Sequence, residues 1–515
     1  MGAPGNKIAV HDVAAGDAET VASVRSQREA TPLYVSRIKV HPARIAGTFR
    51  RIKWAILAFC LTVYYVAPWL RWDRGPNAPH QALLIDLPGR RAYFFWLEIW
   101  PQEIYYLTGL LILAAIGLFL VTSLLGRVWC GYACPQTVWT DLFMQVERLI
   151  EGDRNARIRL DRAPPSLSKF AKRAAKHSAW LVIAAATGGA WVLYFQDAPT
   201  ALGRIFSGQA AVGTYFFIGL FTATTYTLAG WAREQVCTYM CPWPRFQSAM
   251  LDDESLIVTY EAWRGEPRGK LKGGTKDEKL GDCIDCMKCV AVCPTGIDIR
   301  DGQQLECIGC GLCIDACNTV MPMIGRPNNL IAFDTLANQA AEAAGGKAVY
   351  RPIRGRTIIY AAVLLLVAGI MVAGLATRSP IGVDVLHERS PLFVLLSGGN
   401  IRNGYTVRIL NKRHVTKSFD LRIDGLDDYA VTAVGADQTG DKTHPLVLET
   451  PPDGVETFRI YVTTSGAALA RNKEKKMEGQ MQETPIAFSV ADHGAGESVS
   501  HGSFFIAPAL ASEEH

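Results

Sequence analysis

The sequence predicts an α-helical membrane protein with a cysteine-rich cytoplasmic segment and a C-terminal all-β sandwich. Three observations predict this class. Five long apolar runs without charged residues occur between residues 54 and 376. Twelve of the 13 cysteines fall in tight clusters, and the last 120 or so residues change to the two-residue period of β-strands.

Composition agrees with a membrane protein that holds metal. Of the 515 residues, 49% are hydrophobic and 20% are charged, below the average of about 25% for soluble globular domains. The net charge of +5, from 53 basic and 48 acidic residues, is too small to indicate nucleic-acid binding. Clustered cysteines in a chain of this size indicate metal ligation rather than the disulfide framework of a small secreted protein.

Five runs are long enough to cross a hydrocarbon core of about 30 Å, which takes about 20 apolar residues in a helix. They are Trp54 to Leu70, Ile104 to Leu125, Ser178 to Phe195, Ala211 to Gly230 and Ile358 to Ala376. A buried core helix would explain any one of them, but five together predict five transmembrane helices.

Basic residues predict the orientation, because loops rich in Lys and Arg stay in the cytoplasm. The loop 126–177 holds ten basic residues, whereas the loop between the third and fourth runs holds one, Arg204. The residues before the first run are also basic: Lys39, Arg44, Arg50, Arg51 and Lys53. We therefore expect a membrane protein, in contact with lipid, whose N-terminus is cytoplasmic and whose C-terminal domain lies across the membrane.

This orientation gives five regions along the chain. They are a polar cytoplasmic N-terminal segment (1–40), four transmembrane helices (41–230), a cytoplasmic segment (231–357), the fifth transmembrane helix (358–377) and a periplasmic domain (378–515).

The cytoplasmic segment contains two C-x2-C-x2-C-x3-C runs, Cys283 to Cys293 and Cys307 to Cys317. In bacterial two-cluster ferredoxins, three cysteines of such a run bind one cluster and the fourth binds the other. The runs therefore predict a ferredoxin domain with its core at about 275–325. One [4Fe-4S] cluster is assigned to Cys283, Cys286, Cys289 and Cys317, and the second to Cys293, Cys307, Cys310 and Cys313. Structural zinc in four-cysteine sites is the competing interpretation.

A second set of cysteines forms an internal repeat. Cys130-Gly-Tyr-Ala-Cys134-Pro follows the second apolar run, and Cys237-Thr-Tyr-Met-Cys241-Pro follows the fourth. The similar offsets predict that the four thiols lie at one depth and can converge between two spans. Soft thiolates favour Cu(I), zinc or iron–sulfur groups, and a redox-active dithiol is a further interpretation. Small buried cysteines that fix a helix bend would give the same pattern.

The C-terminal region predicts about seven short strands. Alternating segments such as Tyr405 to Leu410, Phe419 to Ile423 and Phe458 to Thr463 are separated by turn residues such as Asp424-Gly425. This pattern predicts an antiparallel immunoglobulin-like sandwich beginning after Pro391, although it has no Cys…Trp…Cys signature.

These features together resemble the CcoG/FixG/RdxA family of cytochrome c oxidase accessory proteins, from about residue 35 to the end. The motifs that carry the resemblance are Cys130 to Trp139, Cys237 to Gln247, Cys293 to Gly302 and Cys313 to Cys317. The resemblance implies an oxidoreductase of the bacterial inner membrane, with its C-terminal domain in the periplasm. It would reduce Cu(II) to Cu(I) during assembly of cbb3-type cytochrome oxidase. Its cofactors would be two [4Fe-4S] clusters, with copper as a further candidate.

We expect electrons from a cytoplasmic donor to pass through the clusters to copper beside Cys130, Cys134, Cys237 and Cys241. A copper transporter or chaperone and cbb3 oxidase assembly components are the expected partners; a homodimer is compatible with the sequence, and nucleic acid is not a partner. Two alternatives stay open: a membrane polyferredoxin that exchanges electrons with quinol, and a non-redox copper scaffold or chaperone.

Overall fold

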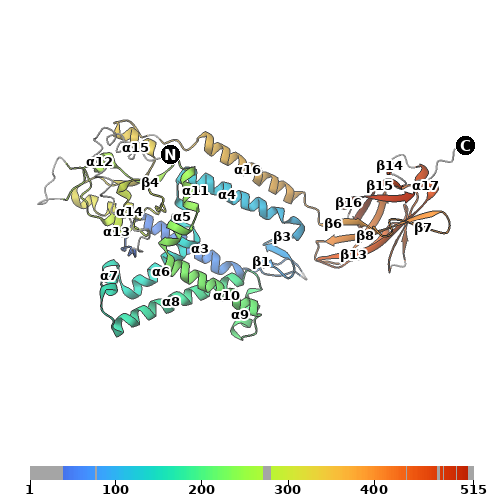
Figure 1. Ribbon diagram of the computed structural model, residues 1–515, viewed down its shortest axis with the longest axis horizontal. Coiled ribbons are helices and arrows are strands. Elements are labelled where there is room, and N and C mark those ends of the chain that lie inside the picture. The colour runs from blue at the N-terminus through green and yellow to red at the C-terminus, as the bar shows by residue number, and fades with distance from the viewer. Residues whose placement is uncertain are drawn as a thin grey trace, which may run out of the picture. The chain divides into compact units, whose positions relative to one another are not determined.

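The computed structural model describes residues 39–508, apart from 76–77, 271–279, 349, 436–437, 472–475, 479–480 and 494–495. Nearly all of the expected N-terminal segment 1–40 lies outside the described residues. The chain forms two compact units (Figure 1). The first comprises Met1–Arg71 and Gln81–Met371, and the second comprises Trp72–His80 and Val372–His515.

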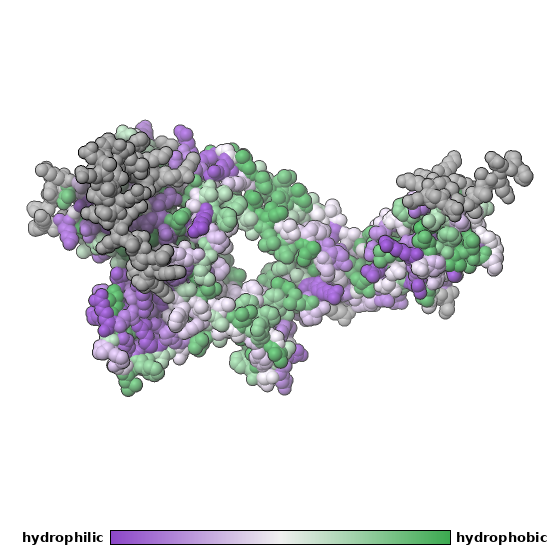
Figure 2. Space-filling view, viewed as in Figure 1, coloured by the Kyte–Doolittle hydropathy of each residue, from purple (hydrophilic) through white to green (hydrophobic). Residues whose placement is uncertain are grey.

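Three of the five expected spans are helices long and apolar enough to cross a membrane. Helix α3 (Thr48–Val66) continues as a 3₁₀ turn to Trp69, α4 covers Tyr105–Leu125, and α16 covers Gly355–Ala376. Helix α4 ends where Gly126 adopts a φ of 62°, a conformation that glycine accepts at a helix C-terminus. Large apolar side chains stand exposed along α4 and α16, and Figure 2 shows hydrophobic surface over both helices. Such a surface suits lipid contact.

The other two expected spans are helical, but neither meets the same test of length and hydropathy. Helix α8 (Leu167–Val192) begins well before the third apolar run, with Ser166 as its N-cap, and its first turns carry Lys and Arg. Helix α10 (Val212–Thr225) changes into a π-helical segment, η3 (Tyr226–Ala232). Five spans therefore stay a prediction, and three are supported by helix length and composition.

Short helices and strands complete the first unit. The helices are α5 (Val128–Tyr132), α6 (Pro135–Glu151), α7 (Arg154–Arg162), α9 (Ala198–Phe206), α11 (Trp243–Met250), α12 (Ala262–Gly265), α13 (Lys288–Val292), α14 (Leu312–Asn318) and α15 (Leu336–Ala343). The 3₁₀ and π turns are η1 (Ala67–Trp69), η2 (Pro101–Glu103), η4 (Val236–Met240), η5 (Ile299–Asp301) and η6 (Met321–Ile324). Strands β1 (Leu83–Asp86), β2 (Arg91–Phe94) and β3 (Leu97–Ile99) form an antiparallel sheet, and β4 (Ile257–Tyr260) pairs with β5 (Ile331–Asp334).

The cysteine-rich part of this unit has a small apolar core. Strands β4 and β5 pair antiparallel from Ile257 opposite Asp334 to Tyr260 opposite Ile331. Their inner side chains pack on Ile314 of α14, on Met321 and on the buried cysteines Cys283 and Cys289. The two cysteine runs are therefore folded against one shared core.

The second unit is a sandwich of two antiparallel sheets, as the sequence predicts. One sheet has the order β11-β10-β13-β8-β6 with β7 on β8, and the other has the order β12-β9-β15-β14 with β16 on β15. The inward residues of both sheets form one core that includes Tyr405, Phe419, Phe488 and Phe505, each at most 1% exposed. The strands are β6 (Ile381–His387), β7 (Val394–Leu395), β8 (Asn400–Asn411), β9 (Lys417–Asp424), β10 (Ala430–Ala433), β11 (Thr439–Gly440), β12 (Leu446–Thr450), β13 (Gly454–Ser465), β14 (Lys476–Glu478), β15 (Met481–Asp492) and β16 (Ser498–Pro508); a short helix, α17 (Gly466–Arg471), follows β13.

The first strand of the sandwich lies inside the expected domain 378–515 but ahead of Pro391, where the strand period was expected to begin. Strand β6 pairs with β8 from Ile381 onward. Only residues 377–380 separate this strand from α16, and its partner β8 begins at Asn400.

Candidate iron–sulfur and thiol sites

The two cysteine runs fold into loops of the same shape. In each run, the residue before the second cysteine and the residue after it have positive φ: Asp285 (52°) and Met287 (58°) in the first, Gly309 (67°) and Gly311 (69°) in the second. These left-handed residues turn the backbone around one point, so that three thiols of each run face inward. The short helices α13 and α14 then begin directly after the turn.

Glycine in the second loop also meets a steric need. A Cβ on Gly311 would lie 2.8 Å from the ring of Phe49 and 3.1 Å from that of Phe333. The second loop is therefore packed closely against α3 and β5, whereas the first loop tolerates Asp285 and Met287 at its surface.

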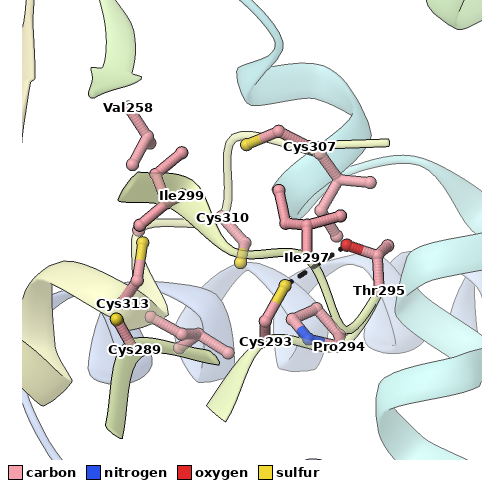
Figure 3. Close-up of a pocket in the computed structure, with 13 residues that line it drawn as sticks. Val258, Cys289, Cys293, Pro294, Thr295, Ile297, Ile299, Cys307, Cys310 and Cys313 are labelled. Atoms are coloured by element: carbon pink, nitrogen blue, oxygen red, sulfur yellow. Dashed lines mark hydrogen bonds between the residues drawn. The ribbon is translucent and has the colours of Figure 1, made fainter. Parts of the chain in front are cut away.

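A cavity beside the second loop is lined by Cys293, Cys307, Cys310 and Cys313, with Cys289 at its margin (Figure 3). Its other walls are apolar and include Val258, Ile297 and Ile299. The Cys293 thiol and the Thr295 hydroxyl lie 3.3 Å apart, within hydrogen-bond distance. A second cavity is lined by Cys283, Cys286, Cys289 and Cys317.

Burial keeps several of these thiols protonated unless a metal replaces the proton. It raises the pKa of Cys289 to about 11 and the pKa values of Cys307 and Cys317 to about 12. Burial raises the pKa of Cys313 well above its ordinary value. Thiolate ligands that are costly to ionise alone are stabilised when they bind metal.

The spacing of the thiols fits a group larger than one ion. Four sulfurs around a single zinc ion, each about 2.3 Å from it, would lie about 3.8 Å apart. Among the described residues, the groups with three ligand atoms all within 4.8 Å of one another contain no cysteine. The described thiols are therefore not gathered around a single ion, and a cubic cluster, in which each cysteine binds a different iron atom, does not require them to be.

The two cavities differ in solvent exposure and charge. The Cys283 cavity has one exposed cysteine, Cys286, beside the buried Cys283 and Cys289, whereas none of the four cysteines assigned to the Cys293 cavity is exposed. Beside the Cys283 cavity, the guanidinium of Arg300 lies 4.0 Å from the Cys283 sulfur and binds the carboxylates of Asp285 and Asp298, each at 2.6 Å. Its hydrogen bond lowers the pKa of Asp298. The cation at this cavity is thus balanced by two anions.

The repeated C-x3-C-P motifs form two similar corners. Cys130 lies on α5, and Cys134 is the N-cap of α6 with Pro135 in its first turn. Cys237 lies on the π-helical turn η4 (Val236–Met240), and Cys241 ends that turn. In both motifs the proline after the second cysteine stands where a new helix starts: Pro135 is the first residue of α6, and Pro242 is the N-cap of α11.

The four thiols of these corners converge. Burial is the main reason why the pKa of Cys130 is raised to about 11, and the charges of Cys134 and Cys241 raise it further. Burial likewise raises the pKa of Cys237 to about 12, with contributions from Cys134, Cys130 and Cys241. Cys130 and Cys237 also pack on the same buried cluster, so the two corners lie close together, although no three of the four sulfurs form a ready-made cage for one ion. We refer to these four residues as the thiol site.

The thiol site contacts the loop of the Cys293 cavity directly. A Cβ on Gly131 would lie 2.9 Å from the Ile308 carbonyl oxygen and 3.0 Å from the Cys310 Cα. The Tyr132 hydroxyl donates a 2.9 Å hydrogen bond to the Cys310 carbonyl. Cys130 and Cys237 also pack on a buried apolar cluster that includes Ile308 and Cys310. Glycine and tyrosine in the first motif therefore join the thiol site to the second cysteine loop.

Comparisons with known proteins agree with this architecture. Residues 232–336 match a family model described as a 4Fe-4S dicluster domain, and residues 107–152 match a 4Fe-4S binding domain. Residues 371–508 match the Ig-like fold at the C-terminus of FixG. The nitrogen fixation protein FixG of Rhizobium meliloti is 49% identical over 486 residues, which cover 89% of this chain and 92% of that protein.

The chain belongs to the FixG family. Proteins RdxB and RdxA of Cereibacter sphaeroides are also similar to it. RdxB is 49% identical over 93% of this chain and 98% of its own length, and RdxA is 52% identical over 76% and 84%. A solved FixG-related protein from Vibrio parahaemolyticus covers 25% of this chain and 97% of its own at 19% identity, with a TM-score of 0.19. The family models and the FixG and Rdx relatives make this chain an iron–sulfur redox protein, and three of its described helices are long and apolar enough to cross a membrane.

Two residues of the FixG-family thiol site were not predicted from the sequence. The Cys130 thiol donates a 3.0 Å hydrogen bond to Gln247, which is fully buried on α11. Arg127 donates to the same Gln247 oxygen at 3.4 Å and also to the Leu305 carbonyl oxygen, beside Cys307. Arg127 thus links the thiol site to the cysteine loop. Gln247 ends the motif Cys237 to Gln247, and Arg127 is one of the basic residues of the loop 126–177. Neither was assigned to the thiol site, because both contacts join segments more than 110 positions apart.

Proposed function

We propose that this chain is a membrane-bound electron-transfer protein that reduces Cu(II) to Cu(I) during assembly of a cbb3-type cytochrome oxidase. The observation that carries the proposal is the contact between the thiol site and the second cysteine loop. Tyr132 and Gly131 hold the two sites together without an intervening layer of side chains. An electron leaving this loop would therefore arrive beside four soft ligands.

Eight cysteines would hold the clusters in two crossed sets. Cys283, Cys286, Cys289 and Cys317 line one cavity, and Cys293, Cys307, Cys310 and Cys313 line the other, which supports this assignment. When bound, the clusters supply one-electron storage and transfer. The exposed Cys286 favours the first set as the entry point for a cytoplasmic electron donor.

Cys130, Cys134, Cys237 and Cys241 would form or border the place where copper is reduced. Each Cu(II) accepts one electron to become Cu(I). Thiolates bind Cu(I) more tightly than oxygen ligands do. Because the thiols are not arranged as a closed cage, we propose that copper is a substrate that passes through rather than a resident ion. A copper transporter or chaperone, or an oxidase assembly component, would then receive the Cu(I).

The membrane arrangement belongs to the same proposal. Helices α8 and α10, the latter with its π-helical extension, would be the third and fourth spans, giving a cytoplasmic N-terminus and a periplasmic C-terminal sandwich in a bacterial inner membrane. The basic loop 126–177 supports this orientation. It puts all twelve clustered cysteines on the cytoplasmic side.

The test compares the wild-type protein with a variant in which Cys130, Cys134, Cys237 and Cys241 are changed to Ser. Both proteins are purified in detergent without oxygen, reduced with dithionite, freed of excess reductant and mixed with Cu(II). We expect the variant to keep its iron–sulfur absorbance and to form no Cu(I). Cys60→Ser, which removes a cysteine of α3 outside the clusters, is the matched control. Copper reduction at the wild-type rate in the fourfold variant would remove the thiol site from the mechanism.

A further inference from the structure

Helix α3 begins on the ferredoxin part of the chain. The Asp315 carboxylate, between Cys313 and Cys317, accepts hydrogen bonds from the backbone N–H groups of Phe49 (3.2 Å) and Arg50 (2.8 Å). The contact is so close that a Cβ on Gly47 would lie 2.2 Å from the Asp315 carboxyl carbon. The first turn of α3 is therefore fixed on α14, as expected for a carboxylate that caps a helix N-terminus.

This docking places Lys53 between the second cysteine loop and the thiol site. Lys53 lies one turn further along α3 and is 2% exposed. It lines a cavity together with Thr295 and Ile308 of the ferredoxin part and Cys237 of the thiol site. The other charged residues of this cavity, Arg233 and Glu234, carry opposite charges. Among the described residues, its ammonium forms no ion pair within 4.0 Å. Asp141, the carboxylate on which Lys53 acts, is paired with Arg50 at 2.9 Å.

The surroundings of the two cysteine sets therefore differ in charge. At the set that contains Cys283, Arg300 is balanced by Asp285 and Asp298, and Cys286 is open to solvent. The set that contains Cys310 has no exposed cysteine, and Lys53 shares a cavity lining with Ile308, which lies between Cys307 and Cys310. The positive charge of Lys53 acts on the Cys310 thiol more strongly than the opposing charge of Asp141 does. Burial alone disfavours adding negative charge to a site, and a nearby cation offsets this cost.

We propose that Lys53 directs electron flow by stabilising the reduced form of the cluster held by Cys293, Cys307, Cys310 and Cys313. One electron leaves the outer cluster, which is oxidised, and enters this inner cluster, which is reduced and gains one negative charge; no bond or proton changes. Burial of the inner site would make this step unfavourable, and the ammonium of Lys53 compensates. The inference rests on the cluster assignment in the proposed function, but it does not depend on copper.

The test is a redox titration of the purified full-length protein without copper, followed by electron paramagnetic resonance and visible absorbance. Lys53→Met removes the charge at similar size. Arg51→Met removes an exposed charge on the same helix, two residues away, and is the matched control. Lys53→Arg restores the charge. We expect Lys53→Met to reduce the equilibrium share of the electron on the inner cluster about tenfold. That is a fall of about 59 mV in the potential of one cluster only, at unchanged iron content.

Arg51→Met and Lys53→Arg should both titrate like the wild type. If Lys53→Met loses iron, Lys53→Gln takes its place in the titration. Unchanged potentials in the charge-free variant with full iron content would overturn the proposal, and so would an equal fall in both potentials or a fall in Lys53→Arg. Because copper is absent, a negative result here is distinct from failure to reduce copper.

Discussion

Glu147 is the centre of a buried charge network that holds the thiol site in place. Its carboxylate lies 2.9 Å from Arg233, 3.1 Å from Arg157 and 3.5 Å from Lys176, and its side chain is 1% exposed. Arg233 precedes Cys237 by one helical turn, so this network joins α6 and α8 to the second thiol pair. Replacing Glu147 by Gln would leave three buried cations without their shared anion.

The structure sets the size of this effect. Burial raises the pKa of Glu147, but Arg233, Lys176 and Arg157 outweigh burial and lower it from 4.5 to about 2. This difference corresponds to about 3 kcal/mol of folding free energy. Because the folded pKa lies below the unfolded value, the contribution is complete above about pH 4.5 and is lost as the pH falls toward 2. We therefore expect Glu147→Gln to lower the free energy of unfolding at pH 7 by about 3 kcal/mol or more, since unpaired buried cations add to the cost.

The assay is thermal and denaturant unfolding in detergent at several pH values. Asp253→Asn, an equivalent change at an exposed acid of the same unit, should change stability by less than about 0.5 kcal/mol. Wild type and Glu147→Gln should also differ less at pH 3 than at pH 7. Equal stability of the two proteins at pH 7 would refute the role assigned to this network.

The other predictions concern the contact between the thiol site and the second cysteine loop. Gly131→Val places atoms against the Ile308 carbonyl and Cys310, which should cost about 1–3 kcal/mol and slow the reoxidation of the clusters by Cu(II). Gly203→Val, at a glycine with open space around it, is the control, and equal reoxidation rates in the two variants at equal iron content would contradict the contact. Tyr132→Phe removes the hydroxyl that donates to the Cys310 carbonyl. It should lower the denaturant midpoint for iron loss by an amount equivalent to about 1–3 kcal/mol. An unchanged midpoint would show that this hydrogen bond does not stabilise the loop. The pKa values of Cys130 and Cys237, about 11 and 12, keep both thiols protonated at pH 7, so Cu(I) must displace their protons. Competition with a Cu(I) chelator should therefore show apparent affinity rising about tenfold per pH unit for each proton released, and a pH-independent affinity would exclude these thiols as ligands.

The sequence predicted those features that depend on local pattern. Cysteine spacing fixes loop geometry within about ten residues, so Cys283 to Cys293 and Cys307 to Cys317 could be recognised without a structure. The hydropathy pattern predicted the helices α3, α4 and α16, and the alternation from Tyr405 to Leu410 predicted a strand of the sandwich.

What the sequence did not show depends on contacts between distant segments. Lys53 counted only as one of several basic residues flanking a membrane span, and nothing local indicates that α3 starts on Asp315, 265 residues away. The π-helical segment Tyr226–Ala232 continues an apolar run whose composition is that of an ordinary helix. Gln247 and Arg127 likewise gain a role only when α11 and α5 are brought together.

The central claim is that electrons from the clusters reach copper, and one measurement tests it directly. The wild-type protein, with its clusters intact, is reduced without oxygen, freed of excess reductant and mixed with Cu(II), while cluster absorbance and a Cu(I)-specific chelator are followed together. The account predicts one Cu(I) for each electron lost by the clusters, with both signals changing at the same rate. Clusters that stay reduced beside unchanged Cu(II) would contradict it and would direct attention to quinol as the redox partner.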